Sequence, residues 1–316
     1  MRALVTGGAG FIGSNLVDAL LAEGAEVTVV DDLSTGRRAN LDAALAAGAV
    51  LHRLDVVDGP ALRAVVAAAR PEVVFHLAAQ IDVRRSVADP AADARVNVEG
   101  TANVLEAARE AGAGRVVLSS TGGALYGEAE QVPTPEEAPI RPLSPYGQSK
   151  HAAEGYCALY ARLHGLPTTV LRYANVYGPR QDPLGEGGVI AIFCGKLAGG
   201  EQPTVYGDGR QTRDYVHVDD VVRANLLAAA AATPDGPLNI GSGVETSVLD
   251  LVEVFGAHAG AAGFEPRFEP PRAGEVLRSC LSAERAAAAL GWTPAIDLAA
   301  GVRSTLDAVV AAETAG

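Results

Sequence analysis

Apolar residues in the first half of the chain form short runs separated by amphipathic segments. The runs are "RALVTG", "EVTVVDD", "VLHRLDV", "EVVFHLAA", "RVVLSS" and the longer "TTVLRYANVYG". They are nearly continuous rather than alternating, which predicts strands buried on both faces of a parallel sheet. Three helices are predicted between these runs. They lie in "FIGSNLVDALLAEG", in a segment opened by Pro60 and in "NVEGTANVLEAAREAG". This order favours an α/β protein with a Rossmann-like doubly wound parallel sheet.

The regular alternation ends near residue 180, where Gly- and Pro-rich loops begin to alternate with single helices and short strands. We therefore expect residues 1–180 to form the sheet domain and residues 181–316 to form a smaller mixed C-terminal substrate lobe. The two are expected to be interleaved, because "PLNIGSG" has the pattern of a strand that returns to the sheet, within a returning segment near residues 210–245.

A glycine loop lies between the first predicted strand and the first predicted helix. Gly7, Gly10 and Gly13 are spaced three residues apart there. Such a loop lets backbone N–H groups approach a pyrophosphate at a helix N-terminus. Asp31 ends the second strand about 20 residues later, where a carboxylate can bind the adenosine ribose and repel a 2′-phosphate. The pattern predicts a dinucleotide site that prefers NAD to NADP.

Neighbouring residues leave alternatives open at this site. Arg37 and Arg38 are basic and weaken the preference for NAD. Asp32 is either the ribose contact or a turn former, and Asp55 either binds the adenine amine or begins a loop.

Tyr146 and Lys150 stand four residues apart on a predicted helix, so their side chains are neighbours. The simplest interpretation is an ordinary surface pair. The alternative is that the lysine keeps the tyrosine close to ionisation, so that the phenol can act as a base.

Composition narrows the possible partners. The net charge is −13 and the sequence pI is about 4.9, which argues against a nucleic-acid surface. Cys157, Cys194 and Cys280 are an odd number without C-x-x-C spacing, so we expect neither a disulfide framework nor a metal site. His76 lies in an apolar strand and is expected to be a core histidine. No signal peptide or membrane-spanning run is visible, so we expect a cytoplasmic protein without a membrane partner.

Several motifs follow one another along the whole chain in a recognisable order. They are the glycine loop, "DDLSTG", "FHLAAQ", "SSTGGALYG", "SPYGQSK", "RYANVYGPR" and "GDGRQTRDYVHVDD". In this order the chain resembles the extended short-chain dehydrogenase/reductase family of nucleotide-sugar enzymes. Within that family it is most similar to the enzymes that invert C4 of UDP-glucose and UDP-galactose.

The resemblance implies that Tyr146 is the catalytic base and Lys150 its partner, which also holds the nicotinamide ribose. A nearby ammonium and the positive nicotinamide would lower the pKa of Tyr146 from about 10. Thr121 would hydrogen-bond the reacting sugar oxygen, with Ser120 as the alternative.

The resemblance also implies two sets of binding residues. Those expected at NAD are Gly7, Gly10, Phe11, Ile12, Gly13, Asp31, Asp32, Leu33, Ser34, Thr35, Gly36, Asp55, Val56, Leu77, Ala78, Ala79, Gln80, Asn97, Ser119, Tyr146, Lys150 and Tyr173. Those expected at the UDP-hexose are Thr121, Tyr146, Asn175, Val189, Tyr206, Arg213, Arg272 and Ser279. Arg180 and Arg278 are weaker candidates, Tyr206 could instead be core, and a salt bridge to Asp214 or Asp219 is the alternative for Arg213.

Gly122 and Gly123 follow Thr121 where related dehydratases have an Asp–Glu pair. Glycines supply neither acid nor base, so the resemblance favours transient oxidation at C4 and return of the hydride, which is epimerisation. Ser279 is small where a tyrosine would exclude an N-acetyl group. UDP-N-acetylglucosamine and UDP-glucuronate therefore stay open as alternative substrates, and an NAD-binding regulator stays open as a non-enzyme. A homodimer through the helices near Asn97 and Tyr146 is also expected.

Overall fold

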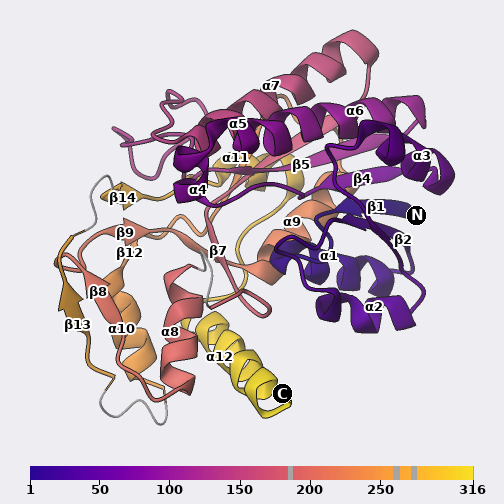
Figure 1. The fold of residues 1–316 in the computed structure, drawn as a ribbon. Helices are drawn as coiled ribbons and strands as arrows, with labels where there is room; N and C mark the ends of the chain where they lie inside the picture. The colour runs from indigo at the N-terminus through magenta and orange to yellow at the C-terminus, as the bar shows by residue number, and fades with distance from the viewer. Residues whose placement is uncertain (184–187, 259–263, 272–275, 316) are drawn as a thin grey trace.

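A seven-stranded parallel sheet forms the centre of the molecule (Figure 1), a computed structural model that describes residues 1–183, 188–258, 264–271 and 276–315. Its strand order is β11-β6-β5-β4-β1-β2-β3. The strands are β1 (Arg2–Thr6), β2 (Glu26–Asp31), β3 (Val50–Arg53), β4 (Val73–His76), β5 (Arg115–Thr121), β6 (Thr168–Tyr173) and β11 (Leu238–Ile240).

Helices cover both faces of the sheet, and each face has its own apolar core. On one side lie α1 (Phe11–Ala22), α2 (Asp42–Ala46), α9 (Val218–Ala230) and α11 (Glu284–Leu290). On the other side lie α3 (Gly59–Ala69), α6 (Gly100–Glu110) and α7 (Pro145–His164), with α3, α6 and α7 drawn above the sheet in Figure 1. Shorter connecting elements are η1 (Arg38–Leu41), α4 (Val83–Ala88), α5 (Pro90–Ala94) and the π-helical turn η2 (Arg95–Glu99). This architecture confirms the expected Rossmann-like α/β fold.

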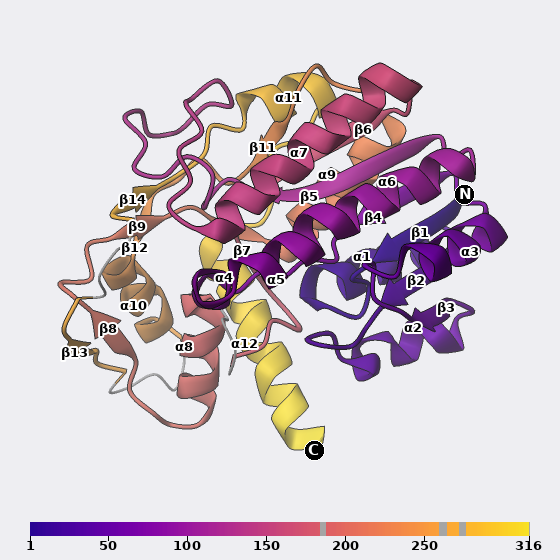
Figure 2. The same ribbon diagram turned by 45° about the horizontal axis from the view of Figure 1, so that its top comes forward.

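The smaller lobe has three short sheets and a separate apolar core around Phe193, Phe255 and Phe264. Strands β7 and β10, strands β12, β9 and β14, and strands β13 and β8 form these sheets. The elements are β7 (Asn175–Tyr177), α8 (Val189–Ala198), β8 (Thr204–Tyr206), β9 (Thr212–Arg213), β10 (Tyr215–His217), β12 (Thr246–Ser247), α10 (Val248–Gly256), β13 (Arg267–Glu269), β14 (Arg278–Ser279) and α12 (Leu298–Ala315). Figure 2 shows this lobe gathered beside the large sheet, reached from it through β7.

The structure departs from the sequence expectation at two strands. The prediction that every strand is buried on both faces is wrong for β3, which lies at the sheet edge with Val50 51% exposed. The run "TTVLRYANVYG" is not one strand, because it divides at Ala174 into β6 of the large sheet and β7, which pairs with β10. Pattern alone cannot show that one apolar run serves two sheets.

Candidate active site

The glycine loop between β1 and α1 is closed tightly against the segment that follows β4. Gly7 has a φ of 70°, and a Cβ there would lie 2.6 Å from the backbone nitrogen of Ala78. A Cβ on Gly13 would overlap the Gly7 carbonyl oxygen and would lie 2.8 Å from the Gly8 Cα. Helix α1 starts at Gly10 without a side-chain cap in the described chain. Its first N–H groups therefore face a cradle suited to an anion.

Asp31, at the end of β2, lies beside this loop. It is 7% exposed, and its two carboxylate oxygens accept hydrogen bonds from Ala9 N at 2.9 Å and Leu33 N at 2.8 Å. Burial raises the pKa of Asp31, while the two N–H groups lower it. Each oxygen keeps a second lone pair, so the carboxylate can still accept a ribose hydroxyl.

Asp32 and Asp55 both form local turns. Asp32 accepts hydrogen bonds from the backbone N–H and hydroxyl of Ser34, at 2.9 and 2.7 Å. Asp55 accepts one from Val57 N at 2.9 Å. The turn-forming interpretation of each residue is therefore seen, and it leaves further lone pairs for a ligand.

Asn97 joins the loop after β4 to the helix that carries Lys150. Its Oδ1 accepts from Gln80 N at 2.9 Å, and its Nδ2 donates to the Gln80 carbonyl at 2.9 Å and to Ser149 Oγ at 3.0 Å. Asn97 is 2% exposed in the π-helical turn η2. These bonds hold Gln80, at the end of the segment Leu77–Gln80, against η2 and α7, so Asn97 fixes the loop that follows β4.

Helix α7 carries Tyr146 and Lys150, as the sequence predicts. Ser144 caps it by accepting a hydrogen bond from Gly147 N at 3.2 Å. Tyr146 is the second residue of α7, and the side chain of Thr121, at the end of β5, interacts with its phenol and acts to lower the phenol's pKa. Lys150 follows one turn later and is 5% exposed. The structure thus brings the phenol, the ammonium and the threonine hydroxyl to one corner of the sheet.

The electrostatics at this corner differ from the expectation. Burial raises the pKa of Tyr146 to about 12, against the Thr121 hydrogen bond that lowers it, and the charge of Asp93 adds to the rise. Burial also lowers the pKa of Lys150 to about 8, although Glu154 and Asp93 act to raise it. A lowered pKa of Tyr146 is therefore not a property of the chain by itself, because desolvation of the phenolate outweighs its neighbours.

Thr121 and Ser120 have different partners. The Ser120 hydroxyl is 4% exposed and donates to Glu154 Oε1 at 2.6 Å, away from Tyr146. Ser119 Oγ lies 2.9 Å from the hydroxyl of Tyr173, and burial raises the pKa of that tyrosine to about 12. Of the two candidate hydroxyls, Thr121 is the one that acts on the pKa of the phenol.

Residues expected at the sugar nucleotide come from several elements of the smaller lobe. Ser279 in β14 pairs in register with Arg213 in β9, so these two lie side by side. Asn175 begins β7, and its Oδ1 lies 3.7 Å from where a Cβ on Gly123 would be. Val189 begins α8 and Tyr206 ends β8. Arg272 lies outside the described residues.

The other arginine candidates have carboxylate or carbonyl partners. Arg180 pairs with Asp18 at 2.6 Å and Arg278 with Glu245 at 2.5 Å, as surface charges would. Arg213 donates to the Thr212 carbonyl at 2.8 Å.

The acidic neighbours of Arg213 also have other bonds. Asp214 accepts from the backbone of Ser242, Gly243 and Leu281. Asp214, the residue before β10, therefore links the start of this strand to the loop after β11.

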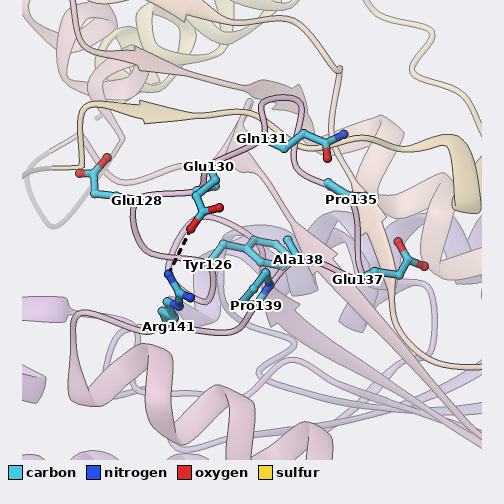
Figure 3. A pocket seen from close by; sticks show the side chains of 10 residues that line it. Tyr126, Glu128, Glu130, Gln131, Pro135, Glu137, Ala138, Pro139 and Arg141 are labelled. Atoms are coloured by element: carbon cyan, nitrogen blue, oxygen red, sulfur yellow. Dashed lines mark hydrogen bonds and ion pairs between the residues drawn. The ribbon is translucent and has the colours of Figure 1, made fainter.

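A separate pocket of about 300 Å³ lies in the loop between β5 and α7 (Figure 3). Glu128, Glu130 and Glu137 line it, and Arg141 pairs with Glu130 at 3.5 Å. None of the residues expected at the cofactor or substrate line it. Three carboxylates suit an anionic nucleotide poorly.

The residues outside the site include a buried histidine and three cysteines. His76 is 2% exposed, with Nδ1 2.7 Å from Thr6 Oγ1 and Nε2 3.0 Å from Thr101 Oγ1, which confirms a satisfied core histidine. Cys157, Cys194 and Cys280 are buried and free. In the part of the chain that the structure describes, no cluster of metal-ligating side chains and no helix able to cross a membrane is found.

Three charged residues near the site were missed at the sequence level. Asp93 reaches it on α5, and Glu154 and Arg172 form a buried ion pair at 2.7 Å. Two signals could have shown the pair. Glu154 follows Lys150 by four residues, and Arg172 is a lone charge inside an apolar strand.

Comparison with known proteins identifies the family. The model for the NAD dependent epimerase/dehydratase family matches residues 3–241. The chain belongs to this family. A family relative from Mycolicibacterium smegmatis, named UDP-glucose 4-epimerase, is 49% identical over 97% of this chain and 98% of its own. A solved UDP-glucose 4-epimerase from Thermotoga maritima with UDP-glucose has a TM-score of 0.94 at 45% identity, covering 100% of both chains. A second one, from Thermus thermophilus in complex with NAD, has a TM-score of 0.89 at 43% identity and covers 98% of this chain and 99% of its own.

Proposed function

We propose that the protein is a UDP-glucose 4-epimerase, an isomerase that inverts C4 of a UDP-hexose with the help of NAD. The observation that carries this function is the placement of the Thr121 side chain against the phenol of Tyr146, with Lys150 one helical turn further along α7. It occurs in a fold shared over its whole length with enzymes of that name at 45% identity. The chain therefore has the groups that the family's reaction requires.

The cradle of the chain fits NAD. Side chains at Gly7 or Gly13 would fill the space next to the first turn of α1, where a diphosphate is held by backbone N–H groups. Asp31 offers its remaining lone pairs to the adenosine ribose. Bound NAD supplies an acceptor, and later a donor, for the hydride from C4.

The side chains at the end of β5 and in α7 handle the proton. We assign Tyr146 the role of base toward the C4 hydroxyl and Thr121 that of holding the same oxygen. The pKa of Tyr146 lies at about 12 in the chain alone, so the phenolate requires added positive charge in the loaded site. Lys150 is buried one turn away and supplies part of it while it stays protonated.

The glycine pair after Thr121 explains why the chemistry stops at epimerisation. The side chain of Leu281 occupies the space that a side chain on Gly122 would need, and Gly123 has no side chain to act as acid or base. These two positions therefore give the 4-keto sugar neither an acid nor a base for elimination, and return of the hydride remains.

The smaller lobe holds the nucleotide in this proposal. Asn175, Val189, Tyr206, Arg213 and Ser279 are assigned to the UDP-hexose, with arginine suited to the diphosphate because its fork donates to two oxygens. The division at residue 180 into a cofactor domain and a substrate lobe belongs to the same proposal. It has support from the separate apolar core of the lobe.

We also assign a homodimer and a cytoplasmic location. Leu159 and Leu163 are 36% and 66% exposed on α7, which gives that helix an apolar outer face. Sedimentation at micromolar concentration tests the dimer, and a monomer contradicts it.

The alternative sugars are less well supported. A UDP-N-acetylglucosamine 4-epimerase and a UDP-glucuronic acid 4-epimerase are similar at 30% and 28% identity. These values are well below the 49% identity of the UDP-glucose enzyme.

The direct test is to incubate the purified protein with UDP-galactose and other UDP-hexoses and to separate the products by chromatography. We expect UDP-glucose without consumption of added NAD. Tyr146→Phe should keep its NAD and lose ~10²–10⁴-fold in kcat. Tyr156→Phe, on the same helix and 38% exposed, is the control. Bound NAD without turnover of any UDP-sugar would instead favour a regulatory protein.

A further inference from the structure

A buried ion pair lies directly beneath the Tyr146–Lys150 face of α7. Glu154 continues the spacing of four residues from Tyr146 and Lys150, and its side chain is 8% exposed. Arg172, in β6, donates from Nε to Glu154 Oε1 at 3.0 Å and from Nη2 to Oε2 at 2.7 Å. A bidentate pair of this kind fixes the carboxylate in direction as well as in distance.

Arg172 is itself held from its other side. Its Nη1 donates to the hydroxyl of Tyr126 at 2.7 Å, and that hydroxyl donates to Asn239 Oδ1 at 2.9 Å in β11. Burial acts to lower the pKa of Arg172, but its bonds to Glu154 raise it, so the cation is permanent. The position of Glu154 is therefore set through β6, the loop after β5 and β11.

Glu154 uses this position to hold the end of β5. The Ser120 hydroxyl donates to its Oε1 at 2.6 Å, and Thr121 is the next residue. The same carboxylate thus fixes the strand that carries Thr121 against the helix that carries Tyr146.

We propose that Glu154, clamped by Arg172, is a positioning residue of the epimerase site, which sets the placement of Thr121 beside Tyr146 through Ser120 and holds a carboxylate one helical turn from Lys150. The assignment deepens the proposed function and rests on it for the kinetic consequences alone.

The charged groups around Lys150 predict how the loss of the Glu154 carboxylate would change the pKa of Lys150. On α7 Lys150 faces Glu154 and Cys157, from α5 it faces Asp93, and from β4 it faces His76. Burial lowers the pKa of Lys150 to about 8, and Glu154 is the largest of the groups that raise it. Without the Glu154 charge the pKa of Lys150 falls further, and the unpaired Arg172 acts in the same direction.

The chain allows this shift to be measured directly, because it has two lysines, Lys150 and Lys196. Protein labelled with ¹³C at the lysine ε-carbon gives two signals, and Lys196→Arg assigns them. Lys196 pairs with Glu201 at the surface, at 2.9 Å, and serves as the internal reference. In the NAD-bound protein, Glu154→Gln should move the midpoint of the Lys150 titration down by about one pH unit. An unchanged midpoint overturns the electrostatic part of the proposal.

Kinetics separate positioning from substrate binding. Glu154→Gln should lower kcat by about 10- to 100-fold, with KM for UDP-galactose almost unchanged and the alkaline limb of kcat moved to lower pH. Ser120→Ala leaves the ion pair intact, and it should lower kcat while leaving the Lys150 titration as in the wild type. Wild-type kcat in Ser120→Ala overturns the tether.

Conservative and control variants guard against a folding defect. Glu154→Asp keeps the charge and should restore the Lys150 midpoint, while its shorter side chain releases Ser120. Glu106→Gln is the matched control, because Glu106 also binds an arginine, Arg109, and a hydroxyl, that of Tyr160, but at the surface. It should change neither the Lys150 midpoint nor kcat.

The two readouts also distinguish this proposal from the proposed function. If the wild type does not interconvert UDP-hexoses, the epimerase assignment fails, and the NMR titration still decides whether Glu154 holds the charge of Lys150. If the wild type is active and Glu154→Gln matches it in both readouts, the positioning role alone is wrong.

Discussion

Replacing His76 by glutamine should make the protein less sensitive to acid. His76 is 2% exposed at the end of β4, with both ring nitrogens bonded to threonine hydroxyls. Burial, and then the charge of Lys150, lower the pKa of His76 from 6.5 to about 3. The neutral ring is therefore required in the folded state, whereas the unfolded chain takes up a proton below pH 6.5.

The size of the effect follows from these two pKa values. Because the folded-state pKa is the lower one, the stability contributed by the neutral ring is fully present above pH 6.5 and is lost as the pH falls toward 3. A pH of 5 lies 1.5 units below the pKa of histidine in the unfolded chain. Protonation at this pH therefore stabilises the unfolded state by about 2 kcal/mol and the folded state hardly at all. The loss reaches about 4 kcal/mol at pH 3, so it is a large part of a typical stability.

Urea denaturation of the NAD-saturated protein at pH 7 and pH 5 measures this difference. His76→Gln lowers stability at both pH values by removing a hydrogen bond, but its loss between pH 7 and 5 should be about 2 kcal/mol smaller than that of the wild type. His164→Gln, at an exposed position of α7, should follow the wild type. The reasoning is refuted if His76→Gln and the wild type lose the same free energy over this range.

Three other substitutions test close contacts described above. Gly13→Ala would place a methyl group on the Gly7 carbonyl oxygen, so we expect this variant to be purified without bound NAD. The ratio of absorbance at 260 and 280 nm measures the bound NAD, and full occupancy would contradict the proposed cradle. The methyl group of Gly122→Ala would overlap the side chain of Leu281 and should lower the free energy of unfolding by about 1–3 kcal/mol in chemical denaturation. Adding Leu281→Ala should recover most of this loss. An unchanged denaturation midpoint in Gly122→Ala would show that the lobe moves aside freely. Ser279→Tyr should abolish turnover of UDP-N-acetylglucosamine and spare UDP-glucose, and a wild type that already rejects the N-acetyl sugar in the chromatographic assay would remove the basis for this expectation.

The large sheet was predictable because its strands are continuous apolar runs with clear punctuation. Pro60 lies in the first turn of α3 as expected, Asp58 and Ser144 cap α3 and α7, and Gly165 ends α7 in a left-handed conformation. The short helices α4 and α5 were missed, since two turns or fewer give too little periodicity. Their caps, Asp82 and Asp89, were the available signal.

The site was predictable in the identity of its groups and not in their energetics. Spacing placed Tyr146 and Lys150 on one helical face, but the rise in the pKa of Tyr146 comes from its burial and from Asp93 on another helix. Desolvation depends on how tertiary structure closes around a group, which residue spacing does not encode. The turn roles of Asp32 and Asp55 were equally open in the sequence, because a carboxylate can bind its own backbone and a ligand from one position.

The place of β11 at the edge of the large sheet has a consequence for synthesis of the chain on the ribosome. Strand β6 is complete at Tyr173, but its outer neighbour begins only at Leu238. At ~5–20 residues per second, translation of the intervening stretch takes on the order of several seconds. During this time the nascent chain presents the backbone of β6 as an unpaired edge. The half-made sheet is then open to pairing with other nascent chains, and a slow codon run between β6 and β11 would lengthen its exposure.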